Sequence, residues 1–235
     1  MILHVIERAL AAHNVARAIV ATDDERVLDV VRSAGFEAVM TRSDHASGSD
    51  RLAEVAATLD GVEVIVNLQG DEPLVSPKTI ERAVDALLKD ETVQVVTTSE
   101  EIRDAADVLS ADVVKVVTDE RGRALYFSRS PIPFPREAVR KYGTLIAALR
   151  IEPKLLATFR KHTGLYVYRR AFLLEYTRWP QSELERLESL EQLRAMGRGA
   201  TIKVIEADSP SIGVDTEQDL ERVRKIFEEM SDAKC

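Results

Sequence analysis

The sequence contains a single cysteine among its 235 residues, and it is the last residue, Cys235. A disulfide framework and a zinc site built from cysteines are therefore excluded. No apolar run is long enough to span a bilayer, and His4, Glu7 and Arg8 interrupt the start of the chain, where a signal peptide would be apolar. We therefore expect a soluble, cytoplasmic protein with no membrane association.

Positive charge is also scarce, because 32 Lys and Arg residues stand against 40 Asp and Glu residues, for a net charge of -8. A protein that coats nucleic acid needs a positive face, so no nucleic-acid partner is expected. A small phosphate-bearing substrate is compatible with this balance, since local arginines, lysines or a bound cation could hold it. There is no internal repeat, low-complexity segment or Pro/Ser-rich linker, and 45% of the residues are apolar. This composition predicts one domain with a sizeable core.

Short β-branched runs alternate with amphipathic segments through the first half of the chain. The pattern predicts strands at 18–22, 37–41, 63–68 and 93–97, separated by helices at 4–13, from about 27 to Gly35, at about 50–59 and from Ser76-Pro77 onward. Continuous apolar strands that alternate with helices are typical of a parallel sheet covered on both faces. We therefore expect an α/β fold with a Rossmann-like, mostly parallel (mixed) sheet.

The second half of the chain has a different pattern. A strand at 113–118 turns through 120–123 into 124–128, which predicts a hairpin. Further helices are expected near 154–161, at 171–177, at 183–196 and after residue 215, with strands at 165–168 and 201–205. We predict a single domain over 1–235 with a small lobe at about 120–180.

Two aspartates follow predicted strands, at the sheet edge where α/β proteins bind ligands. Asp71 lies in Gln69-Gly70-Asp71-Glu72-Pro73, and Asp215 lies in Gly213-Val214-Asp215-Thr216. An ordinary turn would explain the first and helix capping would explain the second. Together the two carboxylates could hold one hard cation, with other positions left to water or phosphate.

The loop Thr41-Arg42-Ser43-Asp44-His45-Ala46-Ser47-Gly48-Ser49-Asp50-Arg51 is dense in hydrogen-bonding groups, and Gly48 permits close backbone approach. Such a loop could bind the edge of a base. The alternative is a solvated loop in which Ser49 or Asp50 caps the next helix.

Three further polar residues stand out. On a continuous helix 183–196, Glu191 projects near Leu184 and Leu187, and an acid on an apolar face is costly unless it is paired or borders a cavity. His162 could donate to a hydroxyl or carboxylate, or could simply favour a helix C-terminus. Arg129 could make a bidentate carboxylate contact, or could be a surface arginine.

Six segments occur in an order that resembles the 3-deoxy-manno-octulosonate (Kdo) cytidylyltransferase family over essentially the whole chain. They are NLQGDEP (67–73), TRSDHASGSDR (41–51), ALYFSRSPIP (124–133), HTGLYVYR (162–169), LESLEQLR (187–194) and GVDTEQDLERV (213–223). Ser49 stands where the family usually has threonine, which keeps the hydroxyl.

The resemblance implies a nucleotidyltransferase fold and transfer of CMP from CTP to the anomeric hydroxyl of Kdo, for lipopolysaccharide synthesis. It implies that Asp71 and Asp215 hold Mg²⁺ and are catalytic, and that the protein is a homodimer. It implies a nucleotide site formed by Arg42, His45, Ser47, Gly48, Ser49, Arg51 and Gln69. It implies a sugar pocket lined by Gln69, Arg129, His162, Tyr166, Glu191 and Gln192.

The family also begins with a strand and a basic, glycine-containing loop that clamps the triphosphate, and the sequence from Met1 resembles the helix that follows this loop. The strand is expected at the centre of the sheet, so 18–22 and 63–68 should face an empty slot with unpaired backbone groups. We interpret Met1 as an internal start in preference to a short paralogue with a repaired sheet. Either way we expect slow turnover by residues 1–235 alone.

Two alternatives remain beside the Kdo enzyme. One is a cytidylyltransferase for another acidic sugar, such as a sialic acid, against which the HTGLY and LEQLR segments weigh. The other is a non-catalytic sugar- or nucleotide-binding relative that lacks the phosphate loop.

Overall fold

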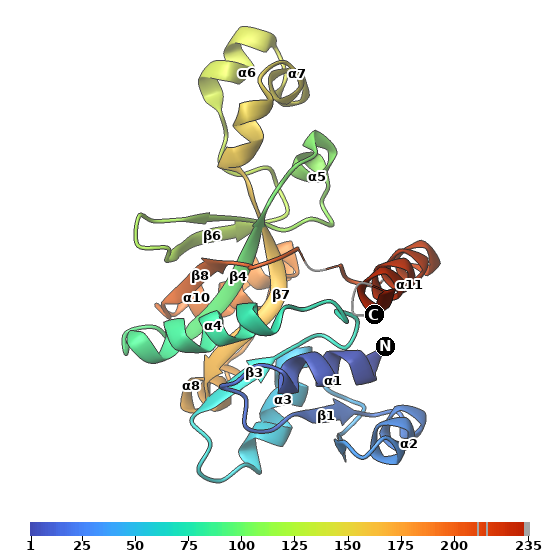
Figure 1. The fold of residues 1–235 in the computed structure, drawn as a ribbon. Coiled ribbons are helices and arrows are strands. Elements are labelled where there is room, and N and C mark those ends of the chain that lie inside the picture. The colour runs from blue at the N-terminus through green and yellow to red at the C-terminus, as the bar shows by residue number, and fades with distance from the viewer. Residues whose placement is uncertain (211, 215, 233–235) are drawn as a thin grey trace.

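The protein is described by a computed structural model that covers residues 1–210, 212–214 and 216–232. It is a mixed α/β fold built on a six-stranded sheet and a separate two-stranded sheet (Figure 1). The predicted fold class is confirmed. Among the described helices, none combines the length and apolar character needed to cross a bilayer.

The large sheet centres on β7 (Arg160–Arg169), the longest strand. Its order is β6-β5-β7-β4-β8, and β3 also pairs with β7. β7 runs antiparallel to β3 (Val64–Asn67) and to β4 (Val95–Glu101), whereas β8 (Ile202–Glu206) runs parallel to β4. Strands β3, β4 and β8 therefore share one direction.

The predicted hairpin forms β5 (Lys115–Thr118) and β6 (Ala124–Ser128), which pair antiparallel. Asp119 N donates to Arg123 O at 2.8 Å, closing the turn, and Gly122 adopts a φ of +75°. A left-handed φ at this position favours glycine, because other residues pay a steric penalty there. The local sequence therefore determines this connection.

The small sheet pairs β1 (Ile19–Thr22) parallel with β2 (Glu37–Met40). Helices α1 (Ile2–Leu10) and α2 (Glu25–Ser33) pack on it through their own cluster, which includes Ile6, Leu28, Val31 and Ala38. In the described part of the chain, no strand pairs with both β1 and β3, and the two are not paired with each other. In Figure 1, α1 lies beside these two strands.

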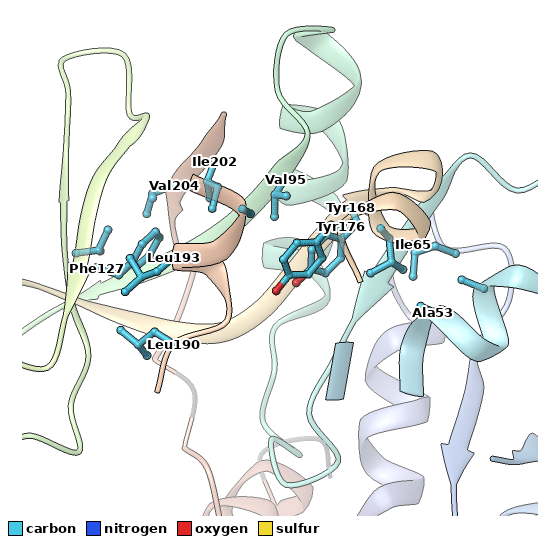
Figure 2. Packing of buried hydrophobic residues seen from close by; sticks show 14 residues of the cluster. Ala53, Ile65, Val95, Phe127, Tyr168, Tyr176, Leu190, Leu193, Ile202 and Val204 are labelled. Carbon is cyan, nitrogen blue, oxygen red and sulfur yellow. The ribbon is translucent and has the colours of Figure 1, made fainter. Parts of the chain in front are cut away.

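Helices cover both faces of the large sheet. α4 (Pro77–Lys89) packs on one face through Ile80, Ala83, Val84 and Leu87 against Val96 and Val167. The other face is covered by α3 (Gly48–Ala57), α8 (Arg170–Tyr176) and α10 (Gln192–Gly197). Figure 2 shows this second core, in which Tyr168 and Tyr176 lie close together between Leu193 and Ile65.

A group of short helices stands apart from the sheet at one end of the molecule (Figure 1). It comprises α6 (Arg136–Tyr142), α7 (Leu145–Ile151) and the 3₁₀ helix η1 (Pro153–Thr158), with α5 (Ala105–Leu109) below them. The helix predicted near 154–161 forms only as far as Thr158, as the 3₁₀ helix η1, because the chain enters β7 at Arg160. Ile102, Val108, Leu149 and Phe159 form the small core of this region.

The predicted helix 183–196 is also wrong. It divides into α9 (Glu183–Glu188) and α10, because Ser189 adopts a left-handed φ of +52°. Leu184 and Leu187 are 47% and 74% exposed, so the apolar face that was expected to include Glu191 does not exist. The last described element is α11 (Glu217–Asp232), as predicted after residue 215.

Candidate functional site

The segment after β3 forms a tight turn beside the C-terminal part of the chain. Glu72 N donates to Gln69 O at 3.2 Å, and Val214 N donates to Asp71 O at 2.9 Å. Asp71 keeps partial exposure, while Gln69 and Gly70 are exposed. The structure thus places Asp71 against the segment that leads to residue 215. Asp215 itself lies outside the described residues.

Strand β7 passes close to this turn. A Cβ atom added to Gly164 would lie 2.7 Å from Glu72 Oε1 and 3.1 Å from Gln69 Cγ. The missing side chain of Gly164 thus leaves the space that the Glu72 and Gln69 side chains occupy beside β7. The HTGLY and QGDEP segments, almost 100 residues apart in sequence, therefore meet in space.

The loop of residues 41–51 is held together by its own side chains. Ser47, not Ser49 or Asp50, is the N-cap of α3, and its hydroxyl accepts from Asp50 N at 3.2 Å. His45 bonds to Glu54, and this hydrogen bond holds the pKa of the Glu54 carboxyl below its usual value. Arg42 Nε forms an ion pair with Asp44 Oδ1 at 3.3 Å.

Arg51 connects this loop to the small sheet. Its guanidinium donates to Thr41 Oγ1 at 2.7 Å and to Asp23 Oδ2 at 2.9 Å. Thr41 follows β2 and Asp23 follows β1, so Arg51 joins the carboxyl ends of both strands to α3. Ser49, in contrast, is buried near Tyr168.

A pocket of about 660 Å³ lies beside the same loop. It is lined by Arg42, Asp44, His45, Ala46, Asp50, Glu54 and Thr177. Two of the predicted nucleotide residues, Arg42 and His45, therefore face one pocket, whereas Gly48 and Arg51 are not part of its lining.

A second group of predicted residues gathers around β7 and the start of α10. The rings of His162 and Tyr166 are 5.3 Å apart, and Tyr166 stacks on Tyr168 at 5.7 Å. Burial raises the pKa of both tyrosines well above the usual value, and the nearby Glu191 adds to the shift. These phenols stay protonated and can donate hydrogen bonds.

Two side-chain atoms of this group are buried without a hydrogen-bond partner among the described residues. They are Glu191 Oε2 and Gln192 Nε2. A buried polar group without a partner costs about 1–3 kcal/mol, so such atoms usually have a partner that the isolated chain does not supply. An acceptor and a donor on consecutive residues suit a ligand with hydroxyl groups.

Arg129 has a role that its sequence position did not suggest. Its Nε donates to Glu188 O at 2.7 Å, and its Nη1 donates to Ala111 O at 2.8 Å. The guanidinium therefore holds the α9–α10 connection and the segment before β5 against the end of β6. Contact between Arg129 and a sugar stays a prediction.

The main residues that sequence reasoning missed are buried charges. Glu185 and Arg194 are 3% and 5% exposed, and their nearest oxygen and nitrogen are 3.3 Å apart. The Arg194 guanidinium also lies 4.5 Å from the centre of the Tyr176 ring. On a continuous helix these residues would lie nine positions apart on opposite sides, so only the break at Ser189 brings them together.

The fold and this arrangement of polar loops around a sheet edge are those of a nucleotidyltransferase. The cytidylyltransferase family model matches residues 1–202. The solved structure of CMP:2-keto-3-deoxy-manno-octonic acid synthetase, complexed with CTP, covers 97% of this chain and 88% of its own, with 42% identity and a TM-score of 0.85. The 4-diphosphocytidyl-2C-methyl-D-erythritol synthase of Anaerococcus prevotii, at 14% identity and a TM-score of 0.57, shares the fold alone.

Curated relatives identify the family within the cytidylyltransferases. The 3-deoxy-manno-octulosonate cytidylyltransferase of Trichlorobacter lovleyi is 49% identical over 96% of this chain and 87% of its own length. That of Syntrophotalea carbinolica is 50% identical over 95% of this chain and 86% of its own. This chain belongs to the 3-deoxy-manno-octulosonate cytidylyltransferase family, as its sequence segments predicted.

Proposed function

We propose that this chain transfers the CMP group of CTP to the anomeric hydroxyl of Kdo and releases pyrophosphate. The observation that carries the proposal is the likeness, over 97% of the chain, to a solved synthetase of this sugar acid with CTP bound. Relatives at 49% and 50% identity carry the name of the same activity. These likenesses favour Kdo over a sialic acid.

We assign a separate place to each substrate. The 41–51 loop and its pocket of about 660 Å³ suit the nucleotide, because Arg42 and His45 face the pocket beside backbone and carboxylate acceptors. The β7–α10 side suits the sugar, because Gln192 and Glu191 carry buried atoms that lack partners. The turn at 69–73 lies against β7 at Gly164 and is the place for the reacting phosphate.

We also propose that Asp71 and Asp215 hold Mg²⁺. Asp71 suits such an ion because it follows a strand, keeps partial exposure and offers hard oxygen ligands. No three His, Cys, Asp or Glu side chains gather in the described ranges, so phosphate oxygens and water would complete the coordination. When bound, the ion would lower the pKa of the attacking hydroxyl and offset phosphate charge.

The chain's own residues would align the sugar hydroxyl with the α-phosphate of CTP. The anomeric oxygen forms a bond to the α-phosphorus, the bond to the pyrophosphate oxygen breaks, and the hydroxyl proton is released. His162, Tyr166, Glu191 and Gln192 would hold the sugar in line with that bond. Such orientation is worth several kcal/mol, because it removes translational and rotational freedom before the chemical step.

Three further features rest on the family resemblance and are proposals. They are a homodimeric state, a cytoplasmic location and a role in lipopolysaccharide synthesis.

Calorimetry combined with a pyrophosphate assay tests the function. We expect heat of binding with CTP and with Kdo in the presence of Mg²⁺, and pyrophosphate release under single-turnover conditions. Enzyme in excess over CTP is the suitable condition, because a single turnover separates the chemical step from product release. We expect Asp71→Asn to reduce the release rate about 100-fold, as loss of a charge-stabilising group commonly does.

Asp60→Asn is the matched control, since Asp60 is an exposed residue in the turn before β3, and it should release pyrophosphate at the wild-type rate. Heat with both ligands but no pyrophosphate would favour the non-catalytic binder. Faster release with a sialic acid than with Kdo would favour the other sugar.

A further inference from the structure

His162 is held by the strand beside it. Its Nε2 atom lies 3.0 Å from Thr97 Oγ1 on β4. The pairing of β4 with β7 shifts register at this point, so that Thr97 lies opposite Tyr166 while Thr98 lies opposite Thr163. This irregularity places the Thr97 hydroxyl, which is fully buried, against the imidazole ring.

The Thr97 hydroxyl has one proton, and a second contact decides where it goes. Thr97 Oγ1 lies 2.8 Å from the carbonyl oxygen of Leu165. A carbonyl can only accept, so the hydroxyl donates to Leu165 O and accepts from His162. The Nε2 atom of His162 must then carry the ring proton, which leaves a lone pair on Nδ1.

The surroundings keep this ring neutral. The Phe127 ring lies edge-on to the imidazole at a centroid distance of 5.0 Å, and the Tyr166 ring lies at 5.3 Å. Burial lowers the pKa of His162 to about 3, since a charged imidazolium is poorly solvated there. Within the described residues Nδ1 makes no hydrogen bond, and His162 retains partial exposure.

We propose that Thr97 is a positioning residue that holds His162 as the Nε2–H tautomer, so that Nδ1 accepts a hydrogen bond from a hydroxyl of the bound sugar. The inference rests on the proposed function for the identity of the ligand. It reverses the role expected from the sequence, in which His162 donates. A neutral nitrogen lone pair repels a carboxylate, so this histidine selects hydroxyl groups and the sugar's carboxylate must be bound elsewhere.

The tautomer can be measured without any substrate. The chain has four histidines, so ¹⁵N-histidine labelling gives a simple spectrum, and the His162→Asn variant assigns the signal. We expect His162 Nε2 to show the ¹⁵N shift of a protonated nitrogen and Nδ1 that of an unprotonated one. We expect Thr97→Val to shift signal toward the other tautomer and Thr97→Ser to retain the wild-type spectrum.

Thr98→Val is the matched control. Thr98 is the next residue of β4, is equally buried, and bonds to Thr163 rather than to His162. Its variant should leave the His162 signals in place. A proton on Nδ1 in the wild-type protein, or an unchanged spectrum in Thr97→Val, would overturn the inference.

Affinity measurements test the consequence for the sugar. We expect Thr97→Val to weaken Kdo binding about tenfold, with CTP affinity within about twofold of the wild type, since one oriented hydrogen bond is lost. One of the Kdo analogues that each lack a single hydroxyl should bind to the wild type about tenfold more weakly than Kdo does. The same analogue and Kdo should bind equally well to His162→Phe.

Equal losses of Kdo affinity in Thr97→Val and Thr98→Val would refute the positioning role. A wild-type protein that shows the Nε2–H tautomer but binds no Kdo would instead refute the proposed function.

Discussion

The two sides of the site differ in how their polar groups are satisfied. In the 41–51 loop, Ser47 caps α3, His45 bonds to Glu54, and Arg51 bonds to Thr41 and Asp23. On the β7–α10 side, buried atoms of Glu191 and Gln192 have no partner in the described part of the protein.

This difference bears on how each side would bind the ligand proposed for it. The 41–51 loop is ordered by its own contacts, so little ordering cost remains when a nucleotide binds. The β7–α10 side is ordered by packing beneath it, and it retains buried polar groups that a bound sugar would pair. Stability and binding should therefore respond differently to substitutions on the two sides.

The largest effect on stability is expected from the buried pair beneath the β7–α10 side. Glu185→Gln removes one charge and leaves the buried Arg194 without its carboxylate partner, which should lower the free energy of unfolding by about 3–5 kcal/mol. Urea unfolding followed by circular dichroism measures the change. The double variant Glu185→Leu/Arg194→Met should recover most of the loss, because both charges are then gone.

The exposed pair Glu137–Arg140 provides the control. Both side chains are at least 70% exposed, and Arg140 Nη2 lies 3.1 Å from Glu137 Oε2. Because solvent screens such a pair, Glu137→Gln should leave the unfolding curve unchanged. Equal effects of Glu137→Gln and Glu185→Gln would mean that the buried pair does not support the β7–α10 side.

A smaller effect, confined to the proposed nucleotide side, is expected from Arg51→Met. The substitution disconnects α3 from Thr41 and Asp23, so CTP affinity should fall about tenfold while Kdo affinity changes less than about twofold. Calorimetry with each ligand separates the two. Equal loss of both affinities would contradict the division into two sides.

The loss of stability in Arg51→Met should also depend on pH. The hydrogen bond from Arg51 holds the pKa of Asp23 below its usual value of 3.8. A carboxyl with a lowered pKa stabilises the fold above its ordinary pKa, and this contribution is lost as the pH falls through the lowered value. The stability difference between wild type and Arg51→Met should therefore shrink below about pH 4.

Arg26→Met is the control for the change in CTP affinity. It breaks a pair with Asp24 outside the site and should leave CTP affinity unchanged.

The smallest effect on stability is expected from Gln192→Leu. Gln192 is 7% exposed and its Nε2 atom has no described partner, so an apolar replacement should leave the free energy of unfolding equal or raise it by about 1 kcal/mol. Kdo affinity should nevertheless fall about tenfold. Gln181→Leu, at an exposed glutamine before α9, should change neither quantity. A clear loss of stability in Gln192→Leu would show that Gln192 already has a structural partner.

Local patterns predicted most of the elements, since β-branched runs and amphipathic spacing act over a few residues. Strands β1, β2, β3 and β8 and helices α2, α4 and α8 lie close to their predicted positions. The prediction of one continuous helix at 183–196 was wrong, because the helical spacing of residues continues through Ser189 while the backbone turns there. The helix predicted at 154–161 ends earlier, at Thr158, because the residues from Arg160 extend the central strand β7.

The sequence by itself determined the fold class, the family and the segments from which the site is built. These depend on residue identity and order, which six ordered segments specify strongly. Only the tertiary structure decided which polar groups meet: Gly164 with the 69–73 turn, Arg51 with Asp23, and Thr97 with His162. The physical reason is that a hydrogen bond's direction and a side chain's burial depend on strands and helices distant in sequence, and local patterns do not record their packing.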